Sequence, residues 1–143
     1  MSTLAVGTIK SISSAAPVFQ NTSGTEKGQL CKAWITFDGK TVTSSTNMDG
    51  VLDSFNISSI TDSGVGKYTI NFANQMANAN YAVVACNGRT TLVNADNSFI
   101  LCVNQNATDG LKSTAGFRID SLGGASYLGF ADAQDASIAV FGD

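Results

Sequence analysis

The chain has 143 residues, a length typical of one domain, and it contains no histidine. Charged residues are only 13% of the total, with 8 Lys+Arg against 11 Asp+Glu and a net charge of -3, so the chain lacks the basic surface that binding to a nucleic-acid duplex requires. The missing histidine removes the usual general base and every zinc site that includes an imidazole. We therefore expect no nucleic-acid partner, no metal and no cofactor.

The composition also predicts the fold class. Hydrophobic residues make up 43% of the chain, enough to form a core, while serine, threonine, asparagine and glycine supply most of its polarity. Serine and asparagine compete for backbone hydrogen bonds in a helix, whereas threonine favours strands and asparagine favours turns. We expect an all-β protein, an antiparallel β-sandwich of the jelly-roll kind with seven to eight strands.

The order of apolar runs and turn signals along the chain predicts two parts. Residues 1–30 lack a sustained apolar period and are expected to be an N-terminal lead-in or attachment segment, whereas residues 31–143 alternate short apolar runs with turns, as in a sandwich domain. The predicted strands cover residues 32–37, 55–60, 67–72, 81–86, 98–103, 117–120, 127–130 and 137–141.

Side-chain alternation predicts which way some of these strands face. In 32–37, Ala33, Ile35 and Phe37 point one way and Trp34 the other, and 67–72 alternates as strictly. In 55–60 we expect a bulge near residues 58–59, with Phe55 and Ile57 on one face. The run 81–86 is almost continuously apolar, which predicts a central strand covered on both faces.

The three cysteines, Cys31, Cys86 and Cys102, include no C-x-x-C spacing and cannot form a complete disulfide framework. Cys86 and Cys102 lie in apolar runs and are predicted to be buried thiols. No secretory signal opens the chain, and no run approaches the roughly 20 apolar residues of a membrane span. We expect synthesis in a cytoplasm and no membrane insertion.

Two pairs of carboxylates, Asp49 with Asp53 and Asp132 with Asp135, have the composition of a glycoside hydrolase site, but turn residues have it as well. Neither pair is surrounded by the group of aromatic residues that usually forms the floor of a sugar-binding cleft. We expect no catalytic residues and no enzymatic activity.

Trp34, the only tryptophan, fits a core position or a contact between subunits, and the sequence leaves both open. Leu4 and Val6 are the apolar residues of the opening segment that could pack against a partner. Arg89 and Tyr127 stand near glycine bends and are of the residue types that dominate binding hot spots.

A long pattern in the sequence is recognisable. It consists of KAWITFDG at 32–39, DSFNISSITDSGVGKYTINF at 53–72, NYAVV at 80–84 and the ending ASIAVFG at 136–142. This pattern resembles that of bacteriophage tail-fibre and related virion proteins, especially of marine and cyanobacterial phages, and the opening MSTL is similar to the start of such fibres. Lys67 departs from the small polar residue usual there, about 30 residues stand where typical fibres carry a long shaft, and residues 88–133 match nothing in the pattern.

The resemblance implies a virion protein: a tail-fibre tip or knob that contacts the host surface, assembled as a homotrimer. Its expected partners are copies of itself, other virion proteins through the N-terminal segment, and a glycan or protein of the host surface. Two alternatives stay open, a capsid decoration or knob protein and, ranked last, a tail-associated polysaccharide depolymerase.

If the fibre interpretation holds, the polar loops 87–97, 104–112 and 123–127 are expected to contact the host. The candidate receptor-binding residues are Arg89, Asn94, Asn104, Asn106 and Tyr127, and the candidate subunit contacts are Trp34, Leu4 and Val6.

Overall fold

The structure is a computed structural model, and it describes residues 18–20, 22–24, 26–88, 98–103, 112–124 and 129–142. The chain divides into two compact units, Met1–Leu30 and Cys31–Asp143. In the first unit, β1 (Val18–Gln20) pairs antiparallel with β2 (Glu26–Gln29). The second unit, called the body below, contains the other strands and the hydrophobic core.

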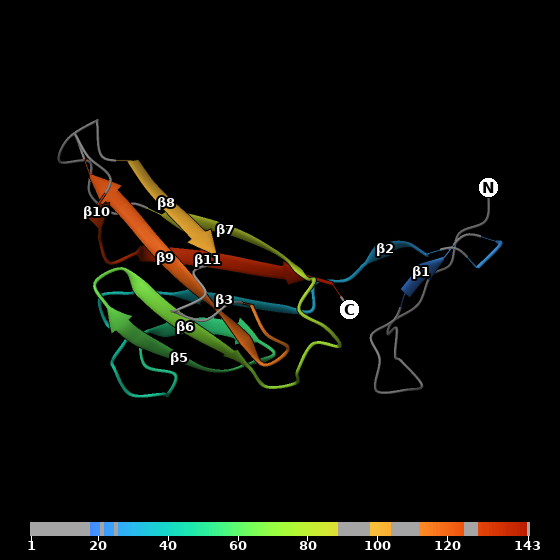
Figure 1. Cartoon of the computed structure of the whole chain (residues 1–143), viewed down its shortest axis with the longest axis horizontal. Coiled ribbons are helices and arrows are strands. Elements are labelled where there is room, and N and C mark those ends of the chain that lie inside the picture. Colours follow the sequence, from blue (N-terminus) through green and yellow to red (C-terminus); the bar gives the residue numbers. More distant parts are fainter. Residues whose placement is uncertain are drawn as a thin grey trace. The chain divides into compact units, whose positions relative to one another are not determined.

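The strands of the body form two antiparallel sheets (Figure 1). The first sheet has the order β4-β3-β11-β7. Its strands are β3 (Ala33–Phe37), β4 (Val51–Phe55), β7 (Ala82–Gly88) and β11 (Gln134–Phe141). In the second sheet β10, β9, β6 and β5 follow in that order, and β8 also pairs with β9. Its strands are β5 (Ile57–Gly64), β6 (Lys67–Phe72), β8 (Ser98–Val103), β9 (Gly116–Gly124) and β10 (Gly129–Phe130).

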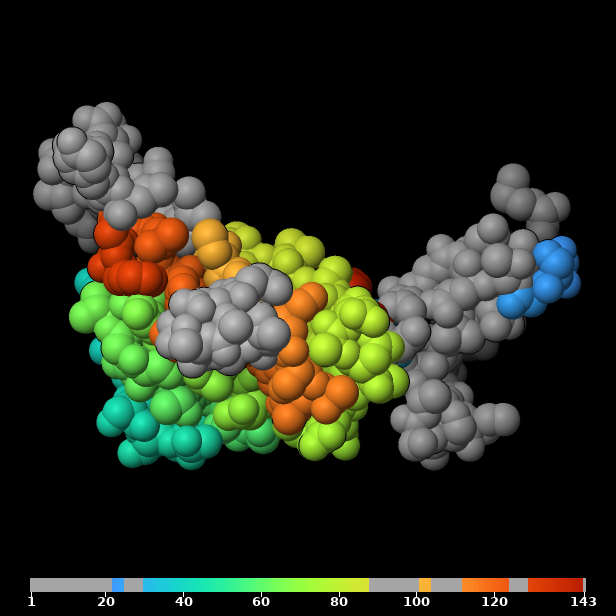
Figure 2. Space-filling view, viewed as in Figure 1, coloured from blue at the N-terminus to red at the C-terminus, as the bar shows by residue number. Residues whose placement is uncertain are grey.

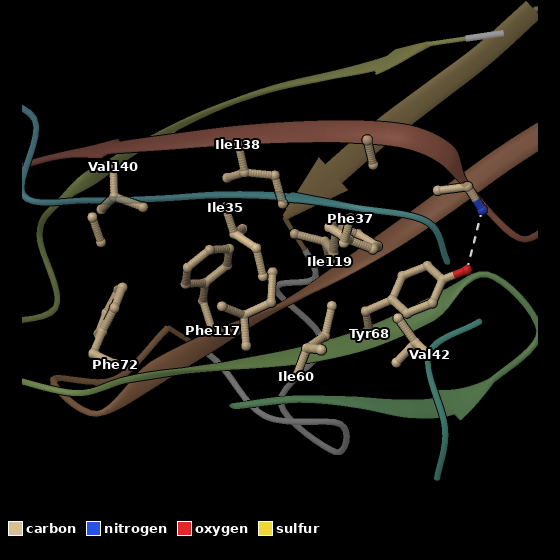
Figure 3. Packing of buried hydrophobic residues seen from close by; sticks show 14 of the residues in the cluster. Ile35, Phe37, Val42, Ile60, Tyr68, Phe72, Phe117, Ile119, Ile138 and Val140 are labelled. Atoms are coloured by element: carbon tan, nitrogen blue, oxygen red, sulfur yellow. Dashed lines mark hydrogen bonds between the residues drawn. The ribbon is translucent and has the colours of Figure 1, made fainter. Parts of the chain in front are cut away.

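The core lies between the two sheets, which makes the body a β-sandwich. Strict alternation buries every second residue of β3 and β6, as expected for strands with one face on a core. Figure 3 shows side chains of the two sheets meeting in this layer, with Ile35 and Ile138 from the first sheet and Ile60, Phe117 and Ile119 from the second. The all-β sandwich expected from composition is therefore confirmed, although the described part of the body has nine strands rather than seven or eight.

One expected strand is divided between the two sheets. Residues 51–64 run through β4 in the first sheet and β5 in the second, and Asn56 stands between them with φ at 56°. The expected bulge is confirmed, since the register of β5 against β6 shifts between Ile57 and Ser59. The prediction that Phe55 and Ile57 share a face is wrong, because the corner at Asn56 turns Phe55 outward while Ile57 packs against the core.

The apolar run at residues 81–86 is not a covered central strand. Its strand, β7, is the last in the first sheet, and Ala82, Val84 and Cys86 are exposed while Val83 and Ala85 pack against the core. Cys86 is therefore not a buried thiol, and Cys102 is only partly buried. A run that is apolar on both faces predicts two apolar faces, but it does not show what covers the second.

Candidate functional site

The outward side of the first sheet carries a row of apolar side chains that crosses all four strands. Phe55 on β4 is the register partner of Trp34 on β3, Trp34 is the partner of Ala139 on β11, and Ala139 is the partner of Val84 on β7. Phe55 is 53% exposed, Val84 is 61% exposed, and Trp34 and Ala139 are partly buried. These four residues are called the apolar row below.

Residues on both sides of this row extend the same surface. On one side Phe141, 37% exposed, is the register partner of Ala82. On the other side Asp53, Thr36, Ser137 and Cys86 form a second row in register, in which the hydroxyl oxygens of Thr36 and Ser137 lie 3.2 Å apart. The outward surface of the first sheet is thus apolar through its centre and along one side.

The outward side of the second sheet carries more polar groups, although Leu122 and its register partner Phe130, 48% exposed, also lie there and Ser59 is buried. Ser63 and Thr69 hydroxyl oxygens lie 3.1 Å apart, the Asn71 amide donates to the Ser59 hydroxyl at 3.0 Å, and the Thr61 hydroxyl donates to that of Thr46 at 3.2 Å. On β9 the Arg118 guanidinium lies 3.6 Å from the Asp120 carboxylate. In Figure 2, seen toward this sheet, the surface of β9 (orange) lies beside that of β5 and β6 (green). The two outward surfaces of the sandwich therefore differ in chemistry.

The strand register separates the two ends of the sandwich. The body begins at Cys31, next to the end of the first sheet where the Lys32 amide donates to the Val140 carbonyl at 2.8 Å. Gly88, the last residue of β7, pairs with Gln134 at the opposite end of β11. The connection from the first unit and the segment that follows β7 therefore leave this sheet at opposite ends.

Register also groups the expected receptor-binding loops. Ser98, which follows residues 89–97, is paired with Gly124, which precedes residues 125–128. The segments that carry Arg89, Asn94 and Tyr127 thus attach to neighbouring strand ends. Residues 104–111 attach instead at Val103, the far end of β8.

Seven of the eight predicted site residues lie outside the described residues: Leu4, Val6, Arg89, Asn94, Asn104, Asn106 and Tyr127. Trp34 is described, and it stands on the outward side of the first sheet beside Phe55 rather than among the core residues. Phe55 and Val84 are surface residues that the sequence does not single out. Val84 belongs to the apolar run 81–86, whose two apolar faces predict burial, and Phe55 is predicted on the same face as Ile57.

The candidate acid pairs have structural roles in part. Asp132 Oδ1 accepts hydrogen bonds from the Gly66 amide at 2.8 Å and the Tyr68 hydroxyl at 3.3 Å, and the Tyr68 hydroxyl accepts one from the Ala133 amide at 3.1 Å (Figure 3). Burial of the phenol, and then the nearby Asp132 charge, raises the pKa of Tyr68, although the Ala133 amide lowers it. Asp49 accepts a hydrogen bond from the Asn47 side chain at 2.7 Å, and Asp53 lies on the outward side of the first sheet.

Within the described residues, no group of three or more histidine, cysteine, aspartate or glutamate side chains is placed to hold a metal ion. Nor does this part of the chain contain a helix with the length and apolarity to cross a membrane. Comparison with known proteins found no matching family model, no matching curated protein and no matching solved structure.

Proposed function

We propose that the chain is a structural protein of a bacteriophage virion, a tail-fibre tip or knob that assembles with copies of itself and contacts the host surface. The observation that carries the proposal concerns the two ends of the first sheet: the N-terminal unit connects at one end, and the segment proposed to contact the host begins at the other. The connection to the N-terminal unit is at the Val140 end, and the segment with Arg89 and Asn94 follows β7 at the Gly88 end. A fibre tip needs two such ends, since one end must join the particle and the other must contact the cell.

Two further features support the proposal. The sequence pattern over 32–39, 53–72, 80–84 and 136–142 resembles that of phage tail-fibre proteins, and in the structure it includes β3, β5 and β6 and parts of β4, β7 and β11. The outward surface of the first sheet also suits a subunit in an assembly, because its exposed apolar residues can pack against copies. Weak contacts of single copies with a host are then multiplied by their number on the particle.

Particle composition tests the assignment to the virion. Purified particles of the phage whose genome encodes this chain should contain it by mass spectrometry, and gold-labelled antibody against it should mark the tail. Labelling in many copies over the head would favour a capsid decoration protein instead, and particles that lack the chain would contradict the proposal.

Adsorption tests the host-contact end. We propose that Arg89, Asn94 and Tyr127, whose segments attach at neighbouring strand ends, form the contact. Particles with Arg89→Ala and Tyr127→Ala should adsorb to host cells at least tenfold more slowly, because an arginine or tyrosine at a binding hot spot commonly contributes about 2 kcal/mol to binding. The matched control is Asn104→Ala with Asn106→Ala, in the segment after the far end of β8. If the two pairs have equal effects, this end is not the contact.

A further inference from the structure

Side-chain size changes across the apolar row. The two large aromatic residues, Phe55 and Trp34, stand on β4 and β3, in one half of the first sheet, and the smaller Ala139 and Val84 stand on β11 and β7, in the other half. All four lie at the same height along the strands, since each is the register partner of the next. At the height of the apolar row, the outward surface therefore has a raised half and a lowered half, and Phe141 of β11 lies beside the row on the lowered half.

This surface is costly to leave in water. Phe55 and Val84 are more than half exposed at opposite edges of the sheet, and Phe141 and Ala82 beside them are exposed as well. Contiguous apolar patches of this kind on soluble proteins mark contact sites, because burying them is favourable.

We infer that this surface packs against the same surface of a second copy, with Phe55 and Trp34 of one copy against Val84 and Ala139 of the next. Raised and lowered halves then fit each other, and the contact reaches the close packing of protein interiors. The inference rests on the self-assembly in the proposed function, not on the host contact.

The size gradient also determines the relative direction of the copies. When the strands of two facing sheets run in the same direction, each aromatic residue meets a small residue of the other copy. When they run in opposite directions about the apolar row, Trp34 meets Trp34 and Ala139 meets Ala139, which crowds one half and leaves a void in the other. We therefore place the symmetry axis along the strands.

This geometry is compatible with the trimer implied by the sequence resemblance. Four strands span three spacings of about 4.8 Å, and about 5 Å more at each corner separates β4 of one copy from β7 of the next. Three such faces closed into a triangle stand roughly 7 Å from its axis, so side chains that point toward the axis can fill the centre.

A disulfide tests the contact. Asp53 on β4 and Cys86 on β7 belong to the same row at opposite edges of the sheet, so the proposed packing brings Asp53 of one copy next to the following copy's Cys86. Within one copy they are three strand spacings apart, about 14 Å, too far for a disulfide. The full chain with Asp53→Cys, oxidised gently and run on a non-reducing gel, should form a covalent oligomer in most of its molecules.

The matched control is Asp53→Cys with Cys86→Ser, which keeps Cys31 and Cys102 and should stay monomeric on the gel. A trimer band supports the contact, and a dimer band that never gives way to a trimer as oxidation proceeds would contradict the closed triangle. Failure of Asp53→Cys to cross-link through Cys86 would overturn the inference.

A second variant separates a loss of association from a loss of folding. Val84→Lys changes a 61% exposed residue, so the thermal transition of the body should remain cooperative while light scattering at micromolar concentration shows a monomer. Association of Val84→Lys equal to that of the unchanged chain, or a monomeric unchanged chain, would contradict the proposed surface. Neither result depends on whether the chain is found in virions.

Discussion

Two buried tyrosines join the hydrophobic core to backbone groups at the surface of the body. The Tyr81 hydroxyl donates toward the carbonyl oxygens of Ser113 and Gly116, at 3.0 and 2.9 Å, and its ring packs edge-on against Phe72. Burial of the phenol raises the pKa of Tyr81 to about 12. Tyr68, with its hydroxyl between Asp132 and Ala133, has a raised pKa for the same main reason. Neither phenol ionises readily in the folded chain.

These pKa values predict a loss of stability in alkali. Above about pH 10 an exposed tyrosine in the unfolded chain loses its proton while Tyr81 keeps its own up to about pH 12, so the unfolded state binds fewer protons. The stabilisation is complete below pH 10 and is lost as pH rises through the folded pKa. The free energy of unfolding should fall by about 1 kcal/mol per pH unit for each buried tyrosine in this range.

Urea unfolding at several pH values measures this slope. Tyr81→Phe should cost about 1 kcal/mol at neutral pH through the lost hydrogen bonds, and it should make the alkaline slope smaller. A slope that is unchanged in Tyr81→Phe would show that Tyr81 ionises equally in both states.

Gly66 illustrates a residue required by its surroundings. Its φ is +66°, and a Cβ there would lie 2.5 Å from the Ser121 carbonyl oxygen and 2.7 Å from the Ala131 amide nitrogen. Gly66→Ala should therefore lower the free energy of unfolding by about 2 to 3 kcal/mol in urea titrations. The control is Gly129→Ala, where nothing lies within 4 Å of the added carbon, with an expected change of about 0.5 kcal/mol or less. Equal losses in both variants would contradict this account.

At the scale of elements, the corner between β4 and β5 links the two sheets. Asn56 has φ at 56°. Its side-chain Nδ2 donates to the backbone carbonyls of Lys32 at 3.0 Å and Asn74 at 3.1 Å, and its Oδ1 accepts a hydrogen bond from the backbone amide of Asn74 at 2.7 Å. Asparagine tolerates this left-handed conformation better than most residues. One side chain thus joins the start of β3 to the segment after β6.

Two substitutions separate the parts of this role. Asn56→Gly keeps the backbone conformation and loses the hydrogen bonds, so we expect it to destabilise the body by about 1 to 3 kcal/mol. Asn56→Val adds the strain of a β-branched residue at positive φ and should lower the free energy of unfolding by about 1 to 2 kcal/mol more. Thermal unfolding of both variants checks the order, and a valine variant as stable as the glycine variant would contradict it.

The alternation of apolar and polar residues predicts individual strands well, but it does not predict the order of strands in a sheet. The inward sets of residues 33–37 and 67–72 followed from the two-residue period of a strand, and both are confirmed. The edge position of β7 and the surface position of Phe55 depend on which strands pair, and Ala139 on β11 is paired with Trp34, far away in the sequence. Gly123 and Gly124, expected at a flexible bend, belong to β9 because β8 pairs with them.

At the scale of the whole molecule, the hydrophobic core of the described residues lies within the body. Every buried hydrophobic residue of the described core cluster lies at or after Ala33, and the boundary between the two units follows Leu30. A chain of residues 31–143 should therefore fold with the same far-ultraviolet dichroism in its strand region and a melting temperature within a few degrees of the full chain. A truncated chain that fails to unfold cooperatively would show that the body needs the first unit.

The sequence predicts which types of residue form the candidate site, but not which residues lie next to one another in it. Trp34 was singled out from the sequence because both faces of its strand are apolar, and the structure adds Phe55 and Val84 through cross-strand register. That Arg89, Asn94 and Tyr127 belong to segments at one end of the sandwich follows from the pairing of Ser98 with Gly124. No local pattern contains that information, since it depends on contacts between strands separated by a loop.

The amino-acid sequence by itself determined that the chain is an all-β protein, where most strands run and which side of β3 and β6 faces inward. These properties arise within a few residues, from backbone preference and alternation. Only the tertiary structure decided that the first sheet presents apolar residues outward and that Cys31, where the body begins, and Gly88, where β7 ends, lie at opposite ends of that sheet. Sheet order and register arise from the burial of all strands together, so they cannot be read from any single segment.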